Sequence, residues 1–195
     1  MSTTAKKSLN IYTISFIAVM AALVYVVTLF RFPLLGSKVH FANAVCLLAG
    51  LLLGPVPGGL AAGLGSALYD ALAGGYDFVN VLITFVSKFA MAWVAGLLAD
   101  RAVKAGKVSP QQVSRIVLAV AIGALTYVAL YMLKTFIFQR WVYGYPLDTA
   151  WATMLSKLPA SLINAGLSIV ATPIFYHALV PALKGAGLWQ KVRGE

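Results

Sequence analysis

The stretch HFANAVCLLAGLLLGPVPGGLAAGLGSALYDALAGG (residues 40–75) decides how this chain folds. It contains two apolar segments, at about 42–53 and 60–73, which are short for helices that cross a bilayer, since these need about 20 residues. Between the segments, Pro55 and Pro57 remove backbone donors and predict a sharp reversal. Either the flanks extend the two segments, or they form a bent pair inside a bundle, where irregular backbone is tolerated.

The composition predicts that lipid solvates most of the chain. Its 195 residues are 61% hydrophobic and only 10% charged, with a mean hydropathy of +0.89, whereas soluble domains carry about 25% charged residues. The length fits a single domain over residues 1–195. We expect the first apolar segment to be retained, because no small-residue cleavage site precedes a polar chain. Cys46 is the single cysteine, so no internal disulfide is expected.

Four longer apolar segments lie outside residues 42–73. In chain order they cover about 11–30, 78–98, 113–138 and 152–183. The last should bend at Pro159 and Pro173. Together with the two short segments they predict an all-α membrane protein, a bundle of six transmembrane helices. None of the segments shows the alternation with period two that is typical of a barrel.

Basic residues in the connections predict the orientation. One set of connections holds Lys6, Lys7, Arg101, Lys104, Lys107, Arg115, Lys184, Lys191 and Arg193, and the opposite set holds Arg31, Lys38 and Arg140. Positive residues favour the cytoplasmic side, so both termini are expected to be cytoplasmic. This topology accounts for the net charge of +10 better than nucleic-acid binding, which would place basic residues on one polar face.

Charged residues within apolar segments are candidates for a binding site, because a charge in hydrocarbon is costly unless it faces a cavity or a partner. Asp70, Lys88, Lys134 and Lys157 qualify. Lys88 is the strongest candidate, since it lies about 15 Å into its segment. Lys134 and Lys157 could instead extend to the outer interface, and Asp70 could form a structural ion pair with a lysine.

Other polar residues extend these positions into stripes at helical spacing. The stripes are Asn80, Thr84 and Lys88; Tyr127, Tyr131 and Lys134; and Lys157, Ser161, Asn164 and Ser168. Tyr69 lies beside Asp70, and His40 and Asn43 stand at the start of the second segment. All are expected in the outer half of the membrane, which predicts a pocket that opens outward and is sealed below.

An aromatic loop and two rows of small residues complete the pattern. The loop WVYGYP (residues 141–146) suits an interfacial belt or a lid that stacks on a flat ring. Gly59, Gly63 and Ser66 form a row that favours close packing within the bundle. Ala18 and Ala22 form a second row on the first segment.

Six segments, the Ala18 and Ala22 pair and the 40–75 stretch together resemble the S components, the substrate-binding subunits, of energy-coupling factor (ECF) vitamin transporters. The 40–75 stretch is similar to the hydroxymethylpyrimidine and pyridoxine subgroup. The resemblance implies a subunit of the bacterial plasma membrane that binds a vitamin or its precursor from outside, under a lid made by the first outer loop. It also implies docking through Ala18 and Ala22 onto a transmembrane coupling protein with two ATPase subunits, followed by toppling that releases the substrate inside.

The resemblance implies that this chain is not an enzyme and needs no cofactor or metal, with ATP hydrolysis carried by the partner subunits. The sequence indeed lacks a GxxxxGK[ST] phosphate loop. The residues expected to bind substrate are Lys88, Thr84, Asn80, Asp70, Tyr69, His40, Asn43, Tyr131, Lys134, Lys157, Ser161 and Asn164.

Two alternatives remain open at this stage. More lysines than carboxylates in the pocket would suit an anionic vitamin such as pantothenate. A small stand-alone secondary carrier is the other alternative, although such carriers usually contain internal repeats, and none is evident here. An intramembrane enzyme would need a nucleophile with a base or a metal cluster, which the sequence does not offer.

Overall fold

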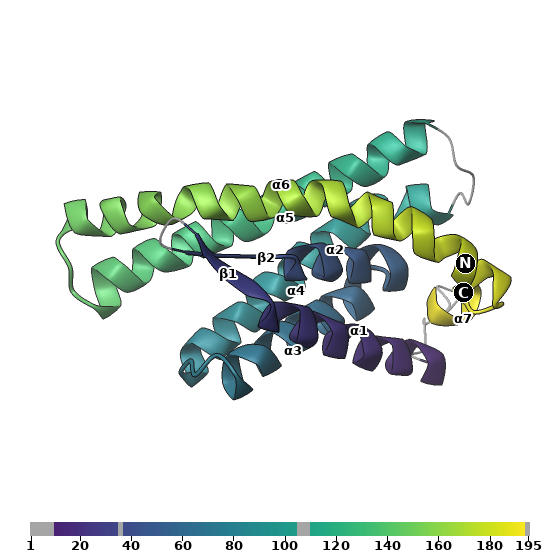
Figure 1. Cartoon of the computed structure of the whole chain (residues 1–195), viewed down its shortest axis with the longest axis horizontal. Helices are drawn as coiled ribbons and strands as arrows, with labels where there is room; N and C mark the ends of the chain where they lie inside the picture. Colours follow the sequence, from purple (N-terminus) through teal and green to yellow (C-terminus); the bar gives the residue numbers. More distant parts are fainter. Residues whose placement is uncertain (1–9, 35–36, 105–109, 194–195) are drawn as a thin grey trace, which may run out of the picture.

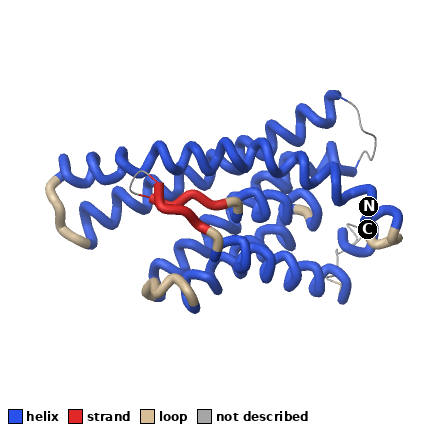
Figure 2. The backbone as a smooth tube through the Cα atoms, viewed as in Figure 1, coloured by secondary structure: helices blue, strands red, loops and turns tan. Residues whose placement is uncertain are grey.

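The computed structural model describes residues 10–34, 37–104 and 110–193. Long helices lie side by side, and a two-stranded hairpin packs against them (Figures 1 and 2). In chain order the elements are α1 (Ile11–Leu29), β1 (Arg31–Leu34), β2 (Ser37–His40), α2 (Ala42–Leu53), α3 (Pro55–Leu72), α4 (Phe78–Lys104), α5 (Pro110–Ile137), the π-helix η1 (Phe138–Val142), α6 (Leu147–Gly185) and α7 (Trp189–Arg193).

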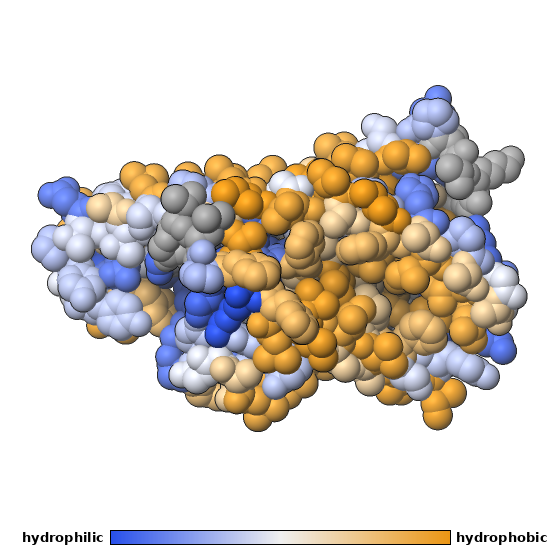
Figure 3. Space-filling model, in the orientation of Figure 1, coloured by the Kyte–Doolittle hydropathy of each residue, from blue (hydrophilic) through white to orange (hydrophobic). Residues whose placement is uncertain are grey.

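Four of these helices are long and apolar enough to cross a membrane. They are α1, α4, α5 together with η1, and α6. Apolar side chains cover most of the middle of the molecule, and hydrophilic ones gather toward its two ends (Figure 3). The surface is that of a multi-pass membrane protein.

The two short helices follow different arrangements: α2 stays short and lies inside the bundle, whereas the flank extends α3 to 18 residues, of which Leu64, Leu68 and Leu72 are exposed. All 12 residues of α2 are buried, because the helix packs against α1, α3, α4 and α6. Neither α2 nor α3 is among the four helices of membrane length and hydropathy. The structure therefore does not confirm six transmembrane helices. It shows a central helix, α2, that is apolar because protein surrounds it.

Several helix boundaries differ from the predicted ones. Helix α3 begins at Pro55, ahead of the predicted start at about residue 60, because a proline in the first turn has a suitable φ and loses no helical hydrogen bond. Gly54, with φ +88°, makes the reversal that was predicted here. Helix α4 continues to Lys104, and α6 is one helix of 39 residues that includes Pro159 and Pro173.

Small residues allow the helices to approach closely. A Cβ atom at Gly65 of α3 would lie 2.3 Å from the carbonyl oxygen of Ala21 in α1, so only glycine fits this contact. Gly59 and Gly63 face the rings of Phe89 and Phe85 in α4. Their row packs within the bundle, as the sequence predicted.

The segment after α1 forms an antiparallel hairpin. Arg31 pairs with His40, and Pro33 pairs with Lys38. Proline is tolerated because a two-stranded ribbon leaves one edge of each strand without a partner.

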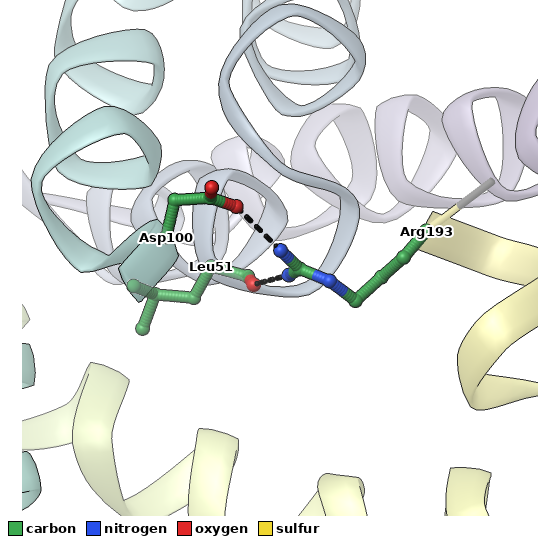
Figure 4. A network of polar contacts seen from close by, with 3 residues as sticks. All are labelled: Leu51, Asp100 and Arg193. Carbon is green, nitrogen blue, oxygen red and sulfur yellow. Dashed lines mark hydrogen bonds and ion pairs between the residues drawn. The ribbon is translucent and has the colours of Figure 1, made fainter. Parts of the chain in front are cut away.

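Helix α7 ties several elements together at one end of the bundle. Arg193 Nη2 lies 2.7 Å from Asp100 Oδ1 in α4, and Nη1 donates a hydrogen bond to the Leu51 carbonyl oxygen of α2 (3.1 Å; Figure 4). Thr13 Oγ1 in the first turn of α1 donates to the Val192 carbonyl oxygen (3.2 Å). The start of α1 and the last described helix therefore lie at the same end. Which side of the membrane this end faces remains a prediction.

Candidate functional site: a polar cavity within the bundle

A cavity of about 510 Å³ lies between α1, the hairpin, α3, α4, α5, η1 and α6. The hairpin that borders it lies far from α7 along the molecule (Figure 1). All but one of the residues predicted to bind substrate line the cavity. They are His40, Tyr69, Asp70, Asn80, Thr84, Lys88, Tyr131, Lys134, Lys157, Ser161 and Asn164. The helical stripes therefore converge on one cavity, as the spacing of the residues indicated.

Asn43, the remaining predicted residue, does not line the cavity but contacts Lys88, which does. Its Oδ1 accepts a hydrogen bond from Lys88 Nζ, and both side chains are buried, with exposures of 3% and 4%. Lys88 Nζ also lies 3.7 Å from the centroid of the Tyr127 ring. A neutral amide and a ring face thus hold the lysine in place, which points to Asn43 as the residue that orients it.

Helix α6 attaches the hairpin to the rest of the cavity wall. Asn164 Oδ1 accepts a hydrogen bond from the His40 backbone N–H (2.9 Å), and Asn164 Nδ2 donates to the Lys38 carbonyl oxygen (2.8 Å). One side chain therefore satisfies two backbone groups of β2. This attachment fixes the hairpin at the edge of the cavity, at the position that a lid would occupy.

His40 presents a neutral imidazole to the cavity. Burial, and then the positive charges of Lys88 and Arg31, lower its pKa to about 3, so the ring is uncharged at neutral pH. Within the described part of the chain, His40 Nδ1 is buried and has no hydrogen-bond partner. That nitrogen can bind a polar group of a ligand.

Asp77 and Asn80 organise the edge of the cavity at the start of α4. Asp77 Oδ1 accepts from the Asn80 backbone N–H (3.0 Å), and the Asn80 side-chain amide donates to Asp77 Oδ2. These hydrogen bonds lower the pKa of Asp77, which keeps the carboxylate charged. They also occupy much of the hydrogen-bonding capacity of Asn80.

The remaining charged candidates face the cavity without forming ion pairs with one another. Lys134 and Lys157 both line it, as a role in binding requires. Among the described residues, no ion pair within 4 Å joins Asp70 to a lysine or arginine. The structural ion pair considered for Asp70 is therefore absent.

The aromatic loop contributes one residue to the cavity. Tyr143 lines it, whereas Trp141 is 68% exposed and packs edge-on against Phe136, with 5.8 Å between the ring centroids. The Tyr145 ring packs against that of Tyr143 (6.3 Å). The loop therefore borders the cavity through Tyr143.

Several lining residues were absent from the predicted site. They include Arg31, Lys38, Ser66, Tyr76, Asp77, Ser87, Tyr127, Phe138, Gln139 and Tyr143. Arg31 and Lys38 were interpreted only through the charge of an outer loop. A lysine and an arginine on the side that carries few positive charges were the signal for a role in the site. Tyr127 lay on a predicted stripe.

The described residues contain no group of three or more His, Cys, Asp or Glu side chains that could hold a metal ion. Cys46 is buried, with Sγ 3.8 Å from Ser66 Oγ. The chemistry that the cavity offers is hydrogen bonding, ring stacking and charge attraction, all of which can bind a small molecule.

The small-residue face of α1 lies elsewhere on the surface. Ala18 and Ala22 are exposed, whereas Ala21 is buried against α3. The pair is therefore not used for packing within the bundle.

Membrane-length helices around a polar cavity define a membrane-embedded binding protein. A family model for the "ECF-type riboflavin transporter, S component" matches residues 8–181. The chain belongs to this family of S components.

A solved structure described as "Structure and mechanism of the S component of a bacterial ECF transporter" has the same fold, with a TM-score of 0.62. Its sequence is 17% identical, and the match covers 88% of the present chain and 97% of the other. No curated protein sequence matches the chain. The family is named for riboflavin, so the comparisons do not support the hydroxymethylpyrimidine and pyridoxine subgroup suggested by residues 40–75.

Proposed function

We propose that this chain captures a small heteroaromatic vitamin from the outer face of the bacterial plasma membrane and passes it into an ECF transporter. The single observation that carries this proposal is the polar cavity. Its volume of about 510 Å³ is in the range of small-molecule sites, and its polar side chains converge from separate helices at membrane depth. Polar groups are expensive there unless they bind something.

The aromatic side chains favour a flat ring as the ligand. The Tyr127 and Tyr131 rings stack with their centroids 6.1 Å apart, and both line the cavity. Tyr69 and Tyr76 line it as well. The family name makes a flavin the first candidate, and a pyridoxine or hydroxymethylpyrimidine ligand is the second. Tyr131 would stack on the ring, while Lys88, Thr84 and Asn164 would bind its polar substituents.

The exposed alanine pair suits a docking surface. Ala18 and Ala22 would allow a helix of a transmembrane coupling protein to approach α1 closely. Two ATPase subunits on that protein would supply the energy for the S component to rotate in the membrane and open its cavity to the cytoplasm. The apolar middle of the molecule (Figure 3) would keep the free-energy cost of that rotation in lipid low.

Native mass spectrometry of the purified chain tests the proposal directly, because a tightly bound vitamin should remain attached and add its mass. Calorimetry with Tyr131→Leu and Tyr131→Phe then tests the site. We expect Leu to weaken binding at least about tenfold through loss of stacking, and Phe to change it little. A chain that binds no heteroaromatic vitamin would refute the proposal.

A stand-alone carrier is the competing function. Uptake into liposomes that contain only this chain, driven by an ion gradient, would favour the carrier. Copurification with an ATPase pair, and uptake that requires it, would favour the S component.

A further inference from the structure

The charges around the cavity are strongly unbalanced. Five cationic side chains line it, whereas only Asp70 and Asp77 contribute carboxylates. The cations are Arg31, Lys38, Lys88, Lys134 and Lys157. His40 is neutral and offsets none of this charge.

None of these cations forms an ion pair with a carboxylate inside the described part of the chain, where the only ion pair within 4 Å joins Arg193 to Asp100. Asp77 is instead hydrogen-bonded to Asn80. The cavity therefore holds positive charge that the protein does not neutralise by direct contact.

The partners that the cations do have are weak and neutral. Arg31 Cζ lies 4.8 Å from the centroid of the Tyr69 ring, and Lys134 Nζ lies 5.5 Å from that of Phe138. Lys88 interacts with the Tyr127 ring and the Asn43 amide. Ring faces and amides bind a cation less strongly than an ionised oxygen does.

Lys88 is the most informative of the five. It is 4% exposed, lies about 15 Å from the start of α4 at 1.5 Å per residue, and lines the cavity. An ammonium group has three donors, and Asn43 takes up one of them. The Tyr127 ring lies against a second side of the ammonium, and the remaining donor capacity can serve a ligand.

Resting on the proposed function, we infer that the ligand carries a negatively charged group, a phosphate ester or a carboxylate, that binds against Lys88. The neighbouring lysines and Arg31 draw the anion into the cavity, and the tyrosines stack on the rest of the molecule. The cavity thus selects the charged form of a vitamin over its neutral counterpart.

Three pairs of probes that differ chiefly in charge test this inference on the full chain in detergent. They are riboflavin and riboflavin 5′-phosphate, pyridoxine and pyridoxine 5′-phosphate, and hydroxymethylpyrimidine and its phosphate. Calorimetry should show the anionic member of the bound pair binding at least about tenfold more tightly. Equal or tighter binding of the neutral member would overturn the inference while leaving the proposed function intact. If none of the six compounds binds, the proposed function fails, and the inference fails with it.

Two variants locate the anion. Lys88→Met should remove most of the preference for the charged member and should affect the neutral member less. Lys184→Met, near α7, is the matched control and should keep the preference. If Lys88→Met does not fold, the comparison in the wild-type chain still decides the question. A full preference in folded Lys88→Met would overturn the assignment to Lys88.

Discussion

Arg193 Nη2 lies 2.7 Å from Asp100 Oδ1 and joins α7 to the end of α4. The Arg193 side chain is 1% exposed, and its Nη1 also binds the Leu51 carbonyl oxygen. We expect Arg193→Met to lower the free energy of unfolding by about 1–3 kcal/mol, because it breaks charged hydrogen bonds in a buried setting. Thermal melting in detergent measures the loss. Substrate affinity, set by the cavity residues, should change less than about twofold.

The double variant Arg193→Met with Asp100→Asn is the control for this prediction. Its destabilisation should be smaller than the sum of the two single effects, because the residues share one interaction. An unchanged melting temperature in Arg193→Met would contradict the stabilising role of α7.

The contact between α1 and α3 predicts that Gly65→Ala destabilises the chain. The added Cβ would lie 2.3 Å from the Ala21 carbonyl oxygen, so the two helices must separate, at a cost of about 1–3 kcal/mol. At Gly166 in α6, a Cβ would meet nothing within 4 Å, so Gly166→Ala should be neutral or stabilising. Equal melting temperatures for the two variants would show that the close approach is unimportant.

The attachment of the hairpin predicts a specific pattern of amide hydrogen exchange. In Asn164→Ala the His40 amide loses its acceptor, and its exchange should accelerate at least about tenfold. Asn164→Asp keeps an acceptor for His40 but loses the donor to the Lys38 carbonyl oxygen, so the His40 amide should stay better protected. Ser161→Ala, one turn away on α6, is the control. Unaltered exchange at His40 in Asn164→Ala would rule out this attachment.

His40 predicts a component of stability that depends on pH. Its pKa is about 3 in the folded chain and 6.5 in an unfolded one, so the unfolded chain binds the proton more readily. Stability should therefore fall as the pH drops from 6.5 toward 3, by about 2 kcal/mol at pH 5. The measurement is the difference in melting between wild type and His40→Gln across this range. His177→Gln, at the other histidine, should keep the dependence, and identical pH profiles for wild type and His40→Gln would refute it.

The alanine face of α1 predicts a separation of binding from transport. Ala18→Trp or Ala22→Trp should leave substrate affinity unchanged and abolish uptake in cells that contain the partner subunits, because a bulky side chain prevents close docking. Leu118→Trp on α5 is the control, since Leu118 is also exposed, and it should support uptake. Normal uptake by the alanine variants would exclude this face as the docking site.

Most residues of the candidate site could be predicted from helical spacing alone. Asn80, Thr84 and Lys88 recur every four residues, so a helix places them on one side without any knowledge of the tertiary structure. The convergence of the stripes followed from the cost of polar groups in hydrocarbon. The same cost singled out Lys88, which the structure buries to 4% exposure beside the cavity.

Features that depend on tertiary contacts were not predictable in this way. The pairing of Arg31 with His40 depends on two strands. In neither strand do polar and apolar residues alternate clearly enough to predict it. Helix α2 resembled a truncated membrane span because lipid and a protein interior select the same apolar side chains. Only its neighbours reveal that it is a core helix.

The position of Asn164 has a mechanical consequence. Helix α6 continues as one helix from the cavity wall to the residues that precede α7, and Asn164 is part of it. A tilt or slide of α6 at its end near α7 would therefore move Asn164, and with it β2, the strand to which Asn164 is hydrogen-bonded. A movement of the helix near α7 can therefore be transmitted along α6 to the entrance of the cavity.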